Sequence, residues 1–301
     1  MEYTAESLTG TYTDSFGSLT YELHLPVKRR KHPPLFVMLH GATQNASDFA
    51  SGTQMHELVA ECGGVTLFPE QSRSAHPQAC WNWYDTRHQF ADEGEPALLA
   101  GLTRQVMAEH GIDRDRVYVA GMSAGGAMAV ILGQAFPELY AAVGVHSGLP
   151  TGVANDLLSA LRVMSSGPPE VFESEAPPVG SAKPSPPTIV FHGDRDRMVH
   201  PLNAEAVLAQ ARRSGGSDAA RKARTAQRRL PGGREVTLTR HARHGGQPDA
   251  ELWMVHGSGH AWTGGSPKGS YTDESGPNAS REMRRFLLSQ KLTADRGRTL
   301  A

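Results

Sequence analysis

The 301-residue sequence predicts an α/β fold with a mostly parallel central sheet and helices on both faces. The first observation is a series of short, continuously apolar segments, which are typical of strands covered on both faces. The second is that segments with helical spacing and helix start and stop signals lie between them. One core fits this length, so we expect a single domain over residues 1–301 with no large lid domain.

The first half of the chain contains three predicted strands and two predicted helical segments. The alternating LTYELHLP (19–26) predicts an early edge strand, and the apolar runs PLFVMLHG (34–41) and GVTLFPE (64–70) predict buried strands. Between those two runs, DFASGTQMHELVAECG (48–63) has helical spacing and ends at a glycine. EPALLAGLTRQVMAEHG (95–111) begins with an acid and a proline and also ends at glycine, which predicts a helix.

The same alternation continues through the middle of the chain. It predicts a strand at RVYVA (116–120), a helix at AMAVILGQAF (127–136), and strands at AAVGVHSG (141–148) and TIVFHGD (188–194). The repetition of strand and helix is what favours a parallel sheet over an antiparallel one.

The last third is less regular. EVTLTRHARHGGQPDAELWMVHG (235–257) predicts a hairpin of two strands around HGGQPD, and NASREMRRFLLSQ (278–290) predicts a closing helix. We expect irregular insertions near 165–187, which is rich in Pro and Ser, and near 212–234. The basic residues of ARRSGGSDAARKARTAQRR (211–229) are diluted by Gly, Ser and Ala, and predict a solvated loop or surface helix.

Composition excludes several classes of function. Lys and Arg number 30 against 31 Asp and Glu, a formal charge of −1, so we expect no nucleic-acid partner. No apolar run approaches the roughly 18–20 residues of a membrane span. The N-terminal MEYTAESLTGTYTDSFG has neither a basic start nor an apolar stretch. We therefore expect a cytoplasmic protein, or a secreted one if a leader was removed, and the oligomeric state stays open.

GMSAGG (121–126) carries the main functional signal. Ser123 lies between two glycines and between a predicted strand and a predicted helix, the setting of a nucleophile elbow. A strained turn there lifts the hydroxyl off the sheet edge, and the helix N-terminus offers N–H groups to a developing oxyanion. The sequence thus predicts Ser123 as a nucleophile; the alternative is an ordinary glycine turn.

A serine nucleophile requires a base that is held by an acid. In the α/β-hydrolase fold these follow the serine in the order acid, then histidine. FHGDRDRMVHP offers Asp194 and Asp196, and we favour Asp196 because it lies further along the loop; Asp194 could brace the turn instead. His260 lies on the Gly-rich loop after the last strand and is the predicted base, whereas His256 is expected to end that strand and pack.

The oxyanion hole is expected from backbone N–H groups. One is that of Ala124, directly after the nucleophile, and the other comes from the turn LHGATQ (39–44). Ala42 is the predicted second donor and Thr43 the alternative. A backbone donor places no demand on the side chain.

Aromatic residues near the predicted catalytic loops are candidates for lining the site. We favour Trp262, two residues after His260, and leave Trp81 and Trp83 open between lining the site and packing beneath it. The histidines show no compact Cys/His ligand frame, so we expect no metal or cofactor and activity in EDTA.

Seven stretches between about residues 35 and 275 together match a known family. The chain resembles the poly(3-hydroxybutyrate) depolymerase-type esterases of the α/β-hydrolase superfamily, which are related to feruloyl and acetylxylan esterases. The resemblance implies Ser123 as nucleophile, His260 as base and Asp196 as acid. It implies a carboxyl-ester substrate built of short 3-hydroxyacyl units or an ester on a plant polysaccharide. The matching stretches are VMLHGATQNASDFA, LFPEQS, CWNWY, GLTRQVMAEHGIDRDRVYVAGMSAGGAMA, AAVGVHSGLP, IVFHGDRDRMVHP and VHGSGHAWTGGSPKGSYTD.

The chain departs from the family pattern at Ala42, where members commonly carry cysteine. If that cysteine normally bridges to the one in CWNW, Cys80 has lost its partner here. Cys62 could substitute, or both thiols could be free, because two cysteines make no disulfide framework. The expected function is a serine esterase for a small-molecule or polymeric ester. The alternatives are a feruloyl or acetylxylan esterase and an inactive hydrolase-like binding protein.

Overall fold

The structure is a computed structural model that describes residues 4–169, 185–213, 222–229, 234–242 and 248–292. Its strands in these segments form a ten-stranded sheet in the order β1-β2-β4-β3-β5-β6-β7-β10-β9-β8, and β11 and β12 pair separately. The strand bounds are β1 Thr4–Asp14, β2 Gly17–Pro26, β3 Leu35–Leu39, β4 Val65–Glu70, β5 Val117–Met122, β6 Ala142–His146, β7 Thr188–Gly193, β8 Lys222–Arg229, β9 Glu235–Ala242, β10 Pro248–Val255, β11 Trp262–Thr263 and β12 Thr272–Asp273.

The centre of the sheet, from β4 through β3, β5, β6 and β7 to β10, is parallel. Antiparallel pairs flank it on both sides, formed by β1, β2 and β4 at one edge and by β10, β9 and β8 at the other. The predicted mostly parallel α/β sheet is therefore confirmed. The carboxyl ends of the central strands lie at one edge of the sheet, where ligand sites form in this class of fold.

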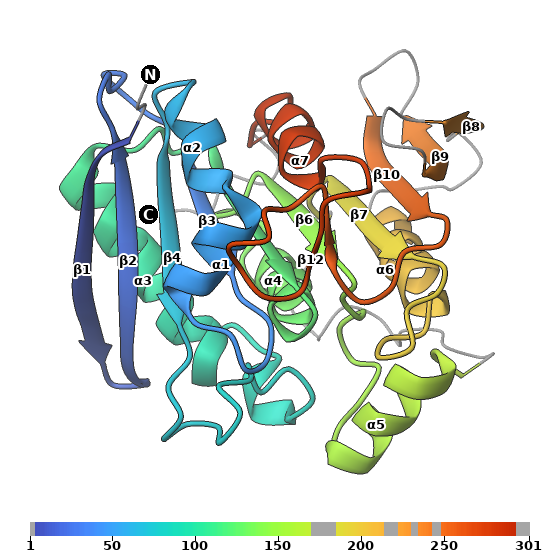
Figure 1. The fold of residues 1–301 in the computed structure, drawn as a ribbon. Helices are drawn as coiled ribbons and strands as arrows, with labels where there is room; N and C mark the ends of the chain where they lie inside the picture. The colour runs from blue at the N-terminus through green and yellow to red at the C-terminus, as the bar shows by residue number, and fades with distance from the viewer. Residues whose placement is uncertain (1–3, 170–184, 214–221, 230–233, 243–247, 293–301) are drawn as a thin grey trace.

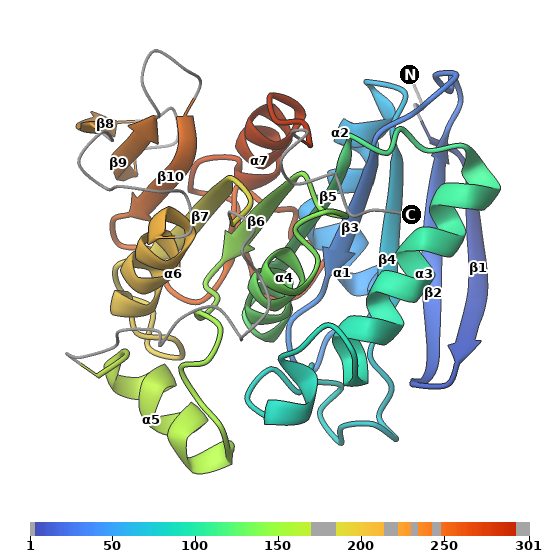
Figure 2. The ribbon, with the colours of Figure 1, turned by 180° about the vertical axis from the view of Figure 1, so that it is seen from behind.

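Helices cover both faces of the sheet (Figures 1 and 2). α1, α2 and α7 lie on one face, and α3, α4 and α6 lie on the other. The alternation within β3 explains the two layers, because Leu35, Val37 and Leu39 belong to one buried cluster and Phe36 and Met38 to the other. The helix bounds are α1 Ala46–Thr53, α2 Met55–Ala60, α3 Gly94–His110, α4 Ala124–Ala135, α5 Leu157–Ser166, α6 Leu202–Arg213 and α7 Ala279–Leu288, with the 3₁₀ turn η1 at Thr86–His88.

Two predictions for the N-terminal half need correction. The strand predicted at 19–26 is not at the edge, because β1, which the sequence analysis did not identify, pairs with β2 along its whole length. The helix predicted at 48–63 is two helices, α1 and α2, separated by Gln54 in the left-handed conformation at φ 51°. A left-handed residue ends one helix and lets the next begin at a new angle.

The prediction of a loop or surface helix over 211–229 is wrong for residues 222–229, whereas residues 211–213 are the last turn of helix α6. Residues 222–229 form the edge strand β8, which pairs antiparallel with β9. Every described side chain of β8 is exposed, so its residues carry no apolar alternation that could have revealed a strand. Charged residues on an edge strand also oppose pairing with a second sheet. Residues 170–184, 214–221 and 230–233 of the two insertions lie outside the described residues.

Helix α5 was not predicted either, and it lies outside the two helix layers (Figure 2). A capping box begins it. The Asp156 side chain accepts a hydrogen bond from the Ser159 N–H, and the Ser159 hydroxyl accepts one from the Asp156 N–H. Three of its leucines are exposed: Leu157, Leu158 and Leu161. In the described part of the chain, no helix has the length and apolar character that crossing a bilayer demands.

Candidate active site

Ser123 occupies the sharp turn between β5 and α4. Its backbone lies at φ 54° and ψ −120°, a strained conformation for a residue with a side chain. A Cβ atom on Gly121 would overlap the Gly125 carbonyl, and one on Gly125 would overlap the Leu39 carbonyl. The glycines on either side of Ser123 are thus required because β3, β5 and α4 approach each other without room for side chains.

Asp196 and His260 follow two neighbouring strands. β7 and β10 pair in parallel, so the loops at their carboxyl ends lie side by side. His260 Nδ1 is 2.7 Å from Asp196 Oδ2, and Asp196 Oδ1 accepts hydrogen bonds from the N–H groups of Met198 and Val199 at 2.9 Å each. These two backbone donors fix the carboxylate, and the carboxylate in turn orients the imidazole.

The environment keeps Asp196 ionised. Burial alone would raise the pKa of this carboxyl, but the hydrogen bond and charge of His260, with the Val199 N–H, outweigh it and lower the pKa. An ionised carboxylate can only accept a hydrogen bond from the nitrogen that faces it, so Nδ1 of His260 carries the hydrogen. Nε2 is then the basic nitrogen of the ring.

Asp194, the alternative acid, belongs to a different pair. Its Oδ2 lies 2.8 Å from His256 Nδ1, and its Oδ1 accepts from the Gly257 N–H at 2.7 Å. His256 Nε2 is in turn 2.8 Å from Thr237 Oγ1 on β9. Asp194 therefore braces the chain just after β10, at His256 and Gly257, and is not the partner of His260.

The backbone of the 39–44 turn distinguishes the two predicted oxyanion donors. The Thr43 N–H already donates to Gln78 O at 2.6 Å. The Ala42 N–H has no acceptor among the described residues. Gln44 holds the turn, since its Oε1 accepts from the Gly41 N–H while its Nε2 donates to Asp48. The geometry thus leaves the Ala42 N–H available and the Thr43 N–H occupied.

Ser123, His260, Ala42 and Ala124 line one pocket of about 380 Å³. An apolar part of the lining comes largely from α5, with one residue from the loop after Asp196. It consists of Leu149, Leu157, Ala160, Leu161, Met164 and Met198. The sequence pattern did not indicate that α5 belongs to the site, because α5 is a short amphipathic helix in a segment bounded by Pro and Ser.

The three tryptophans have different positions. Trp83 lines the pocket. Trp81 lies beneath the 39–44 turn, fully buried, and donates from Nε1 to His40 O at 3.1 Å. Trp262, the favoured candidate, does not line the pocket: it is 1% exposed, stacks on His146 at 5.1 Å, and donates to Ser280 Oγ. This corrects the prediction, because β11 turns the Trp262 side chain into the core although His260 is two residues away.

Both cysteines are free. Cys80 is buried and donates to the Trp81 carbonyl, while Cys62 donates to the Val59 carbonyl. Burial, with a smaller effect of Glu95, raises the pKa of the Cys80 thiol to about 12. Cys62 therefore does not take the place of a missing partner for Cys80.

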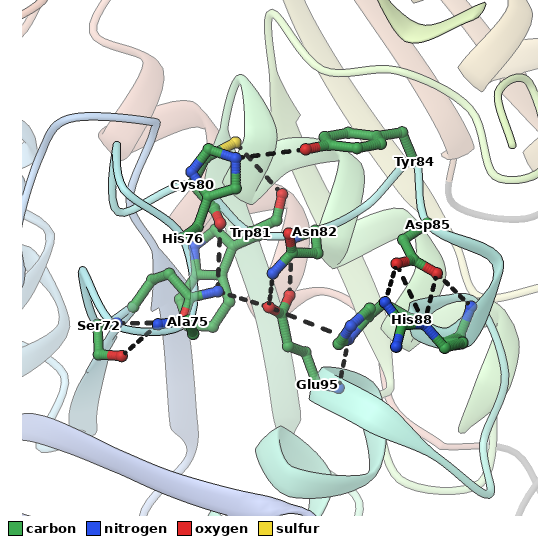
Figure 3. Close-up of polar contacts among 12 residues, drawn as sticks. Ser72, Ala75, His76, Cys80, Trp81, Asn82, Tyr84, Asp85, His88 and Glu95 are labelled. Atoms are coloured by element: carbon green, nitrogen blue, oxygen red, sulfur yellow. Dashed lines mark hydrogen bonds and ion pairs between the residues drawn. The ribbon is translucent and has the colours of Figure 1, made fainter. Parts of the chain in front are cut away.

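Glu95, a buried carboxyl in the first turn of α3, supports the segment that lines one side of the pocket. Glu95 accepts hydrogen bonds from Gln71 Nε2 at 2.5 Å and from the backbone and side-chain nitrogens of Asn82 at 2.8 and 2.6 Å (Figure 3). The Gln71 N–H donates to His40 Nε2, and His40 Nδ1 lies 2.8 Å from Gly41 O. Glu95 thereby connects the CWNWY segment to the turn that carries Ala42.

Comparison with known proteins places this arrangement in context. The sequence matches the family described as "Esterase PHB depolymerase" over residues 19–234. It is 30% identical over 200 residues to poly(3-hydroxyalkanoate) depolymerase C of Paucimonas lemoignei, covering 64% of this chain and 48% of that protein. It is 25% identical to probable acetylxylan esterase A of Aspergillus fumigatus over 66% of this chain and 55% of that protein. The chain therefore spans about half the length of these curated relatives.

A solved structure shows the same fold. The acetyl xylan esterase from Aspergillus awamori superposes with a TM-score of 0.72 at 20% identity, covering 93% of this chain and 98% of that one. At this identity the likeness bears on the fold alone. The predicted α/β-hydrolase fold is confirmed.

Proposed function

The chain belongs to the esterase PHB depolymerase family, and on that premise we propose that it is a serine esterase that hydrolyses carboxyl esters. Its substrates are poly(3-hydroxybutyrate) or 3-hydroxyalkanoate oligomers, or short-chain acyl esters. The observation that carries the proposal is the His260–Asp196 pair at 2.7 Å, with His260 lining the same pocket as the strained Ser123.

In the proposed acylation step, Ser123 Oγ attacks the acyl carbon and its proton passes to Nε2 of His260. Asp196 stabilises the imidazolium that forms. It can do so because its lowered pKa keeps the carboxylate ionised. The ester C–O bond then breaks, and the alcohol leaves with the proton from His260. A covalent acyl-serine remains.

In the proposed deacylation step, water replaces the alcohol. His260 takes a proton from the water, the hydroxide attacks the acyl carbon, and the carboxylic acid leaves as Ser123 recovers its proton. In both steps the negative oxygen of the tetrahedral intermediate receives hydrogen bonds from the N–H groups of Ala42 and Ala124. The Ala42 N–H, which has no acceptor in the described part of the chain, and the start of α4 support this role.

The shape of the pocket supports small or linear substrates. Its wall of leucine and methionine side chains suits an aliphatic chain, and Leu157 and Leu161 remain partly exposed at the same site. A feruloyl or acetylxylan esterase is the second candidate. It is favoured by the similarity to feruloyl esterase B of Thermothelomyces thermophilus, 26% identical over 66% of this chain and 71% of that protein.

A substrate panel with a matched variant tests the proposal. Wild-type protein and Ser123→Ala are assayed on 3-hydroxybutyrate oligomers, 4-nitrophenyl butyrate, methyl ferulate and acetylated xylan. We expect turnover of the first two by the wild type and a loss of about 10³-fold or more in Ser123→Ala with unchanged circular dichroism. Faster turnover of methyl ferulate or xylan would favour the second candidate.

The non-catalytic alternative is tested with a fluorophosphonate probe, which reacts only with an activated serine. Labelling of the wild type and none of Ser123→Ala is expected. A folded wild type that neither labels nor hydrolyses any ester of the panel would identify a binding protein and refute the proposal.

A further inference from the structure

Two polar side chains lie together in the part of the pocket that residues 76–84 line. His76 and Tyr84 both line the pocket, and His76 Nε2 is 3.3 Å from the Tyr84 hydroxyl (Figure 3). Neither residue belongs to the machinery of nucleophile, base, acid and oxyanion donors. Resting on the proposed function, we propose that the Tyr84 hydroxyl is a specificity-determining donor. It binds an oxygen atom of the substrate next to the scissile ester.

The direction of the hydrogen bonds shows what Tyr84 can offer. His76 Nδ1 accepts from the Gln78 N–H at 3.1 Å, so Nδ1 carries no hydrogen in this arrangement. The hydrogen of the neutral ring is then on Nε2, which donates to the oxygen of Tyr84. The Tyr84 oxygen is therefore an acceptor toward His76, and its own O–H is available to donate to a group in the pocket.

Tyr84 is also kept protonated. Burial, followed by electrostatic interactions with Cys80, Asp85 and Glu95, raises the pKa of the phenol above its ordinary value. A protonated phenol is a hydrogen-bond donor, and an ester carbonyl, ether or hydroxyl oxygen is the matching acceptor.

The surrounding structure holds the donor in place. Tyr84 packs edge to face on Trp83 with ring centroids 5.5 Å apart. Two residues before Tyr84, Asn82 is bonded to the buried Glu95 through its backbone and its side chain. On the other side, the Ala79 N–H donates to His76 O and closes the turn that carries His76. A donor fixed in this way binds an acceptor with little loss of conformational entropy.

The second hydroxyl pair of the pocket lacks this fixed direction. Thr43 Oγ1 and the Tyr271 hydroxyl are 3.3 Å apart, and either atom can be the donor. Tyr271 is 41% exposed, so water competes for its proton. The directed donor at Tyr84 is therefore the feature that selects substrates with a second oxygen. These are hydroxyacyl esters, where the oxygen lies on the acyl side, or esters of oxygen-bearing alcohols.

The test uses two matched pairs of esters, hydrolysed under pH-stat control. Methyl 3-hydroxybutyrate against methyl butyrate probes an oxygen on the acyl side. 2-Methoxyethyl acetate against butyl acetate probes one on the alcohol side, since an ether oxygen replaces a methylene. The readout is the ratio of kcat/KM within each pair, for wild type, Tyr84→Phe, His76→Ala and the control Tyr12→Phe. Tyr12 lies on β1, where its hydroxyl donates to Asp14.

In Tyr84→Phe we expect at least one ratio to fall by about three- to tenfold, the range of one neutral hydrogen bond. His76→Ala should lower the same ratio less, because the hydroxyl remains but is no longer oriented, and Tyr12→Phe should keep both wild-type ratios. The pair that responds identifies the side on which the oxygen lies. Ratios that stay at the wild-type value in both Tyr84→Phe and His76→Ala would overturn the inference, whatever happens to the absolute rates. Failure of the wild type on all four esters would refute the proposed function and, with it, this inference.

Discussion

His260 and Asp196 are joined by a 2.7 Å contact between Nδ1 and Oδ2, while Asp194, two residues before Asp196, is bonded to His256. The loop after β7 therefore carries two carboxylates that serve two histidines of the loop after β10. Of the two pairs, only the more buried one, His260 with Asp196, reaches the pocket, since His260 lines it and His256 does not. A substitution at Asp196 therefore has a matched control at Asp194 in the same loop.

Asp196→Asn should lower kcat by about 10³- to 10⁴-fold, because an amide does not hold the imidazole in the tautomer that leaves Nε2 basic. Asp194→Asn should cost less than about tenfold, since that carboxylate braces Gly257 and His256 instead. Steady-state kinetics on 4-nitrophenyl butyrate, with circular dichroism as the folding control, measures both. Equal losses in the two variants would contradict the assignment of Asp196 as the orienting acid.

Gly125→Ala should destabilise the protein by about 2–3 kcal/mol or more, because the new Cβ would overlap the carbonyl oxygen of Leu39 in the neighbouring strand. Gly126→Ala is the matched control on the same helix. There the Cβ would meet the Gly121 carbonyl oxygen at 3.2 Å, and the higher helix propensity of alanine offsets part of the crowding. Urea denaturation of both variants tests this, and a Gly125→Ala protein as stable as Gly126→Ala would show that β3 and α4 are further apart than described.

Glu95→Gln should lower the free energy of unfolding by about 1–3 kcal/mol, because the new NH₂ group would face the nitrogen donors of Asn82. Its kcat/KM should fall as well, since the segment that carries Trp83 and Tyr84 loses its anchor. Glu109→Gln on the same helix is the control: Glu109 is exposed and, among the described residues, accepts a side-chain hydrogen bond only from Gln105 Nε2. A Glu95→Gln protein indistinguishable from Glu109→Gln in both measurements would refute the anchoring role.

The pair of His24 and His56 should make stability depend on pH. Their rings are 4.5 Å apart between β2 and α2, and burial, with a smaller effect of the His24 charge, lowers the pKa of His56 to about 4. The unfolded chain binds this proton near pH 6.5 and the folded chain only near 4. The free energy of unfolding therefore loses nothing to this titration well above pH 6.5, and it falls as the pH drops from about 6.5 toward 4.

His56→Phe removes that titration. Between pH 7 and pH 5 the wild type should lose about 2 kcal/mol more stability than the variant does, as follows from the difference between the two pKa values. Urea denaturation at the two pH values measures it. The comparison is internal to each protein, so any change in packing at pH 7 cancels. An identical loss in both proteins would exclude His56 as a source of the pH dependence.

Local sequence determined much of this molecule. The continuously apolar runs at 34–41 and 64–70 correspond to β3 and β4, and the glycine after His110 ends α3 in the left-handed conformation at φ 60°. Each of these depends on interactions within a few residues, which is why a pattern can reveal it. The same holds for the strand–turn–helix setting of Ser123, where Gly121 and Gly125 are needed because backbone segments lie too close for a Cβ atom.

Tertiary structure alone decided which side chains meet. The strand β8 shows no apolar alternation and exists because β9 offers it a free edge. Trp262 was the favoured lining residue but packs in the core, whereas Trp83, whose role the sequence left open, lines the pocket. The direction of a side chain depends on the strand or turn that carries it and not on its distance in sequence from His260. The partners His76 and Tyr84 are eight residues apart on an irregular loop, and helix α5 reaches the pocket from the connection between the paired strands β6 and β7. A sequence records the preferences of its own short segments, whereas contacts between segments follow from how the whole sheet is ordered.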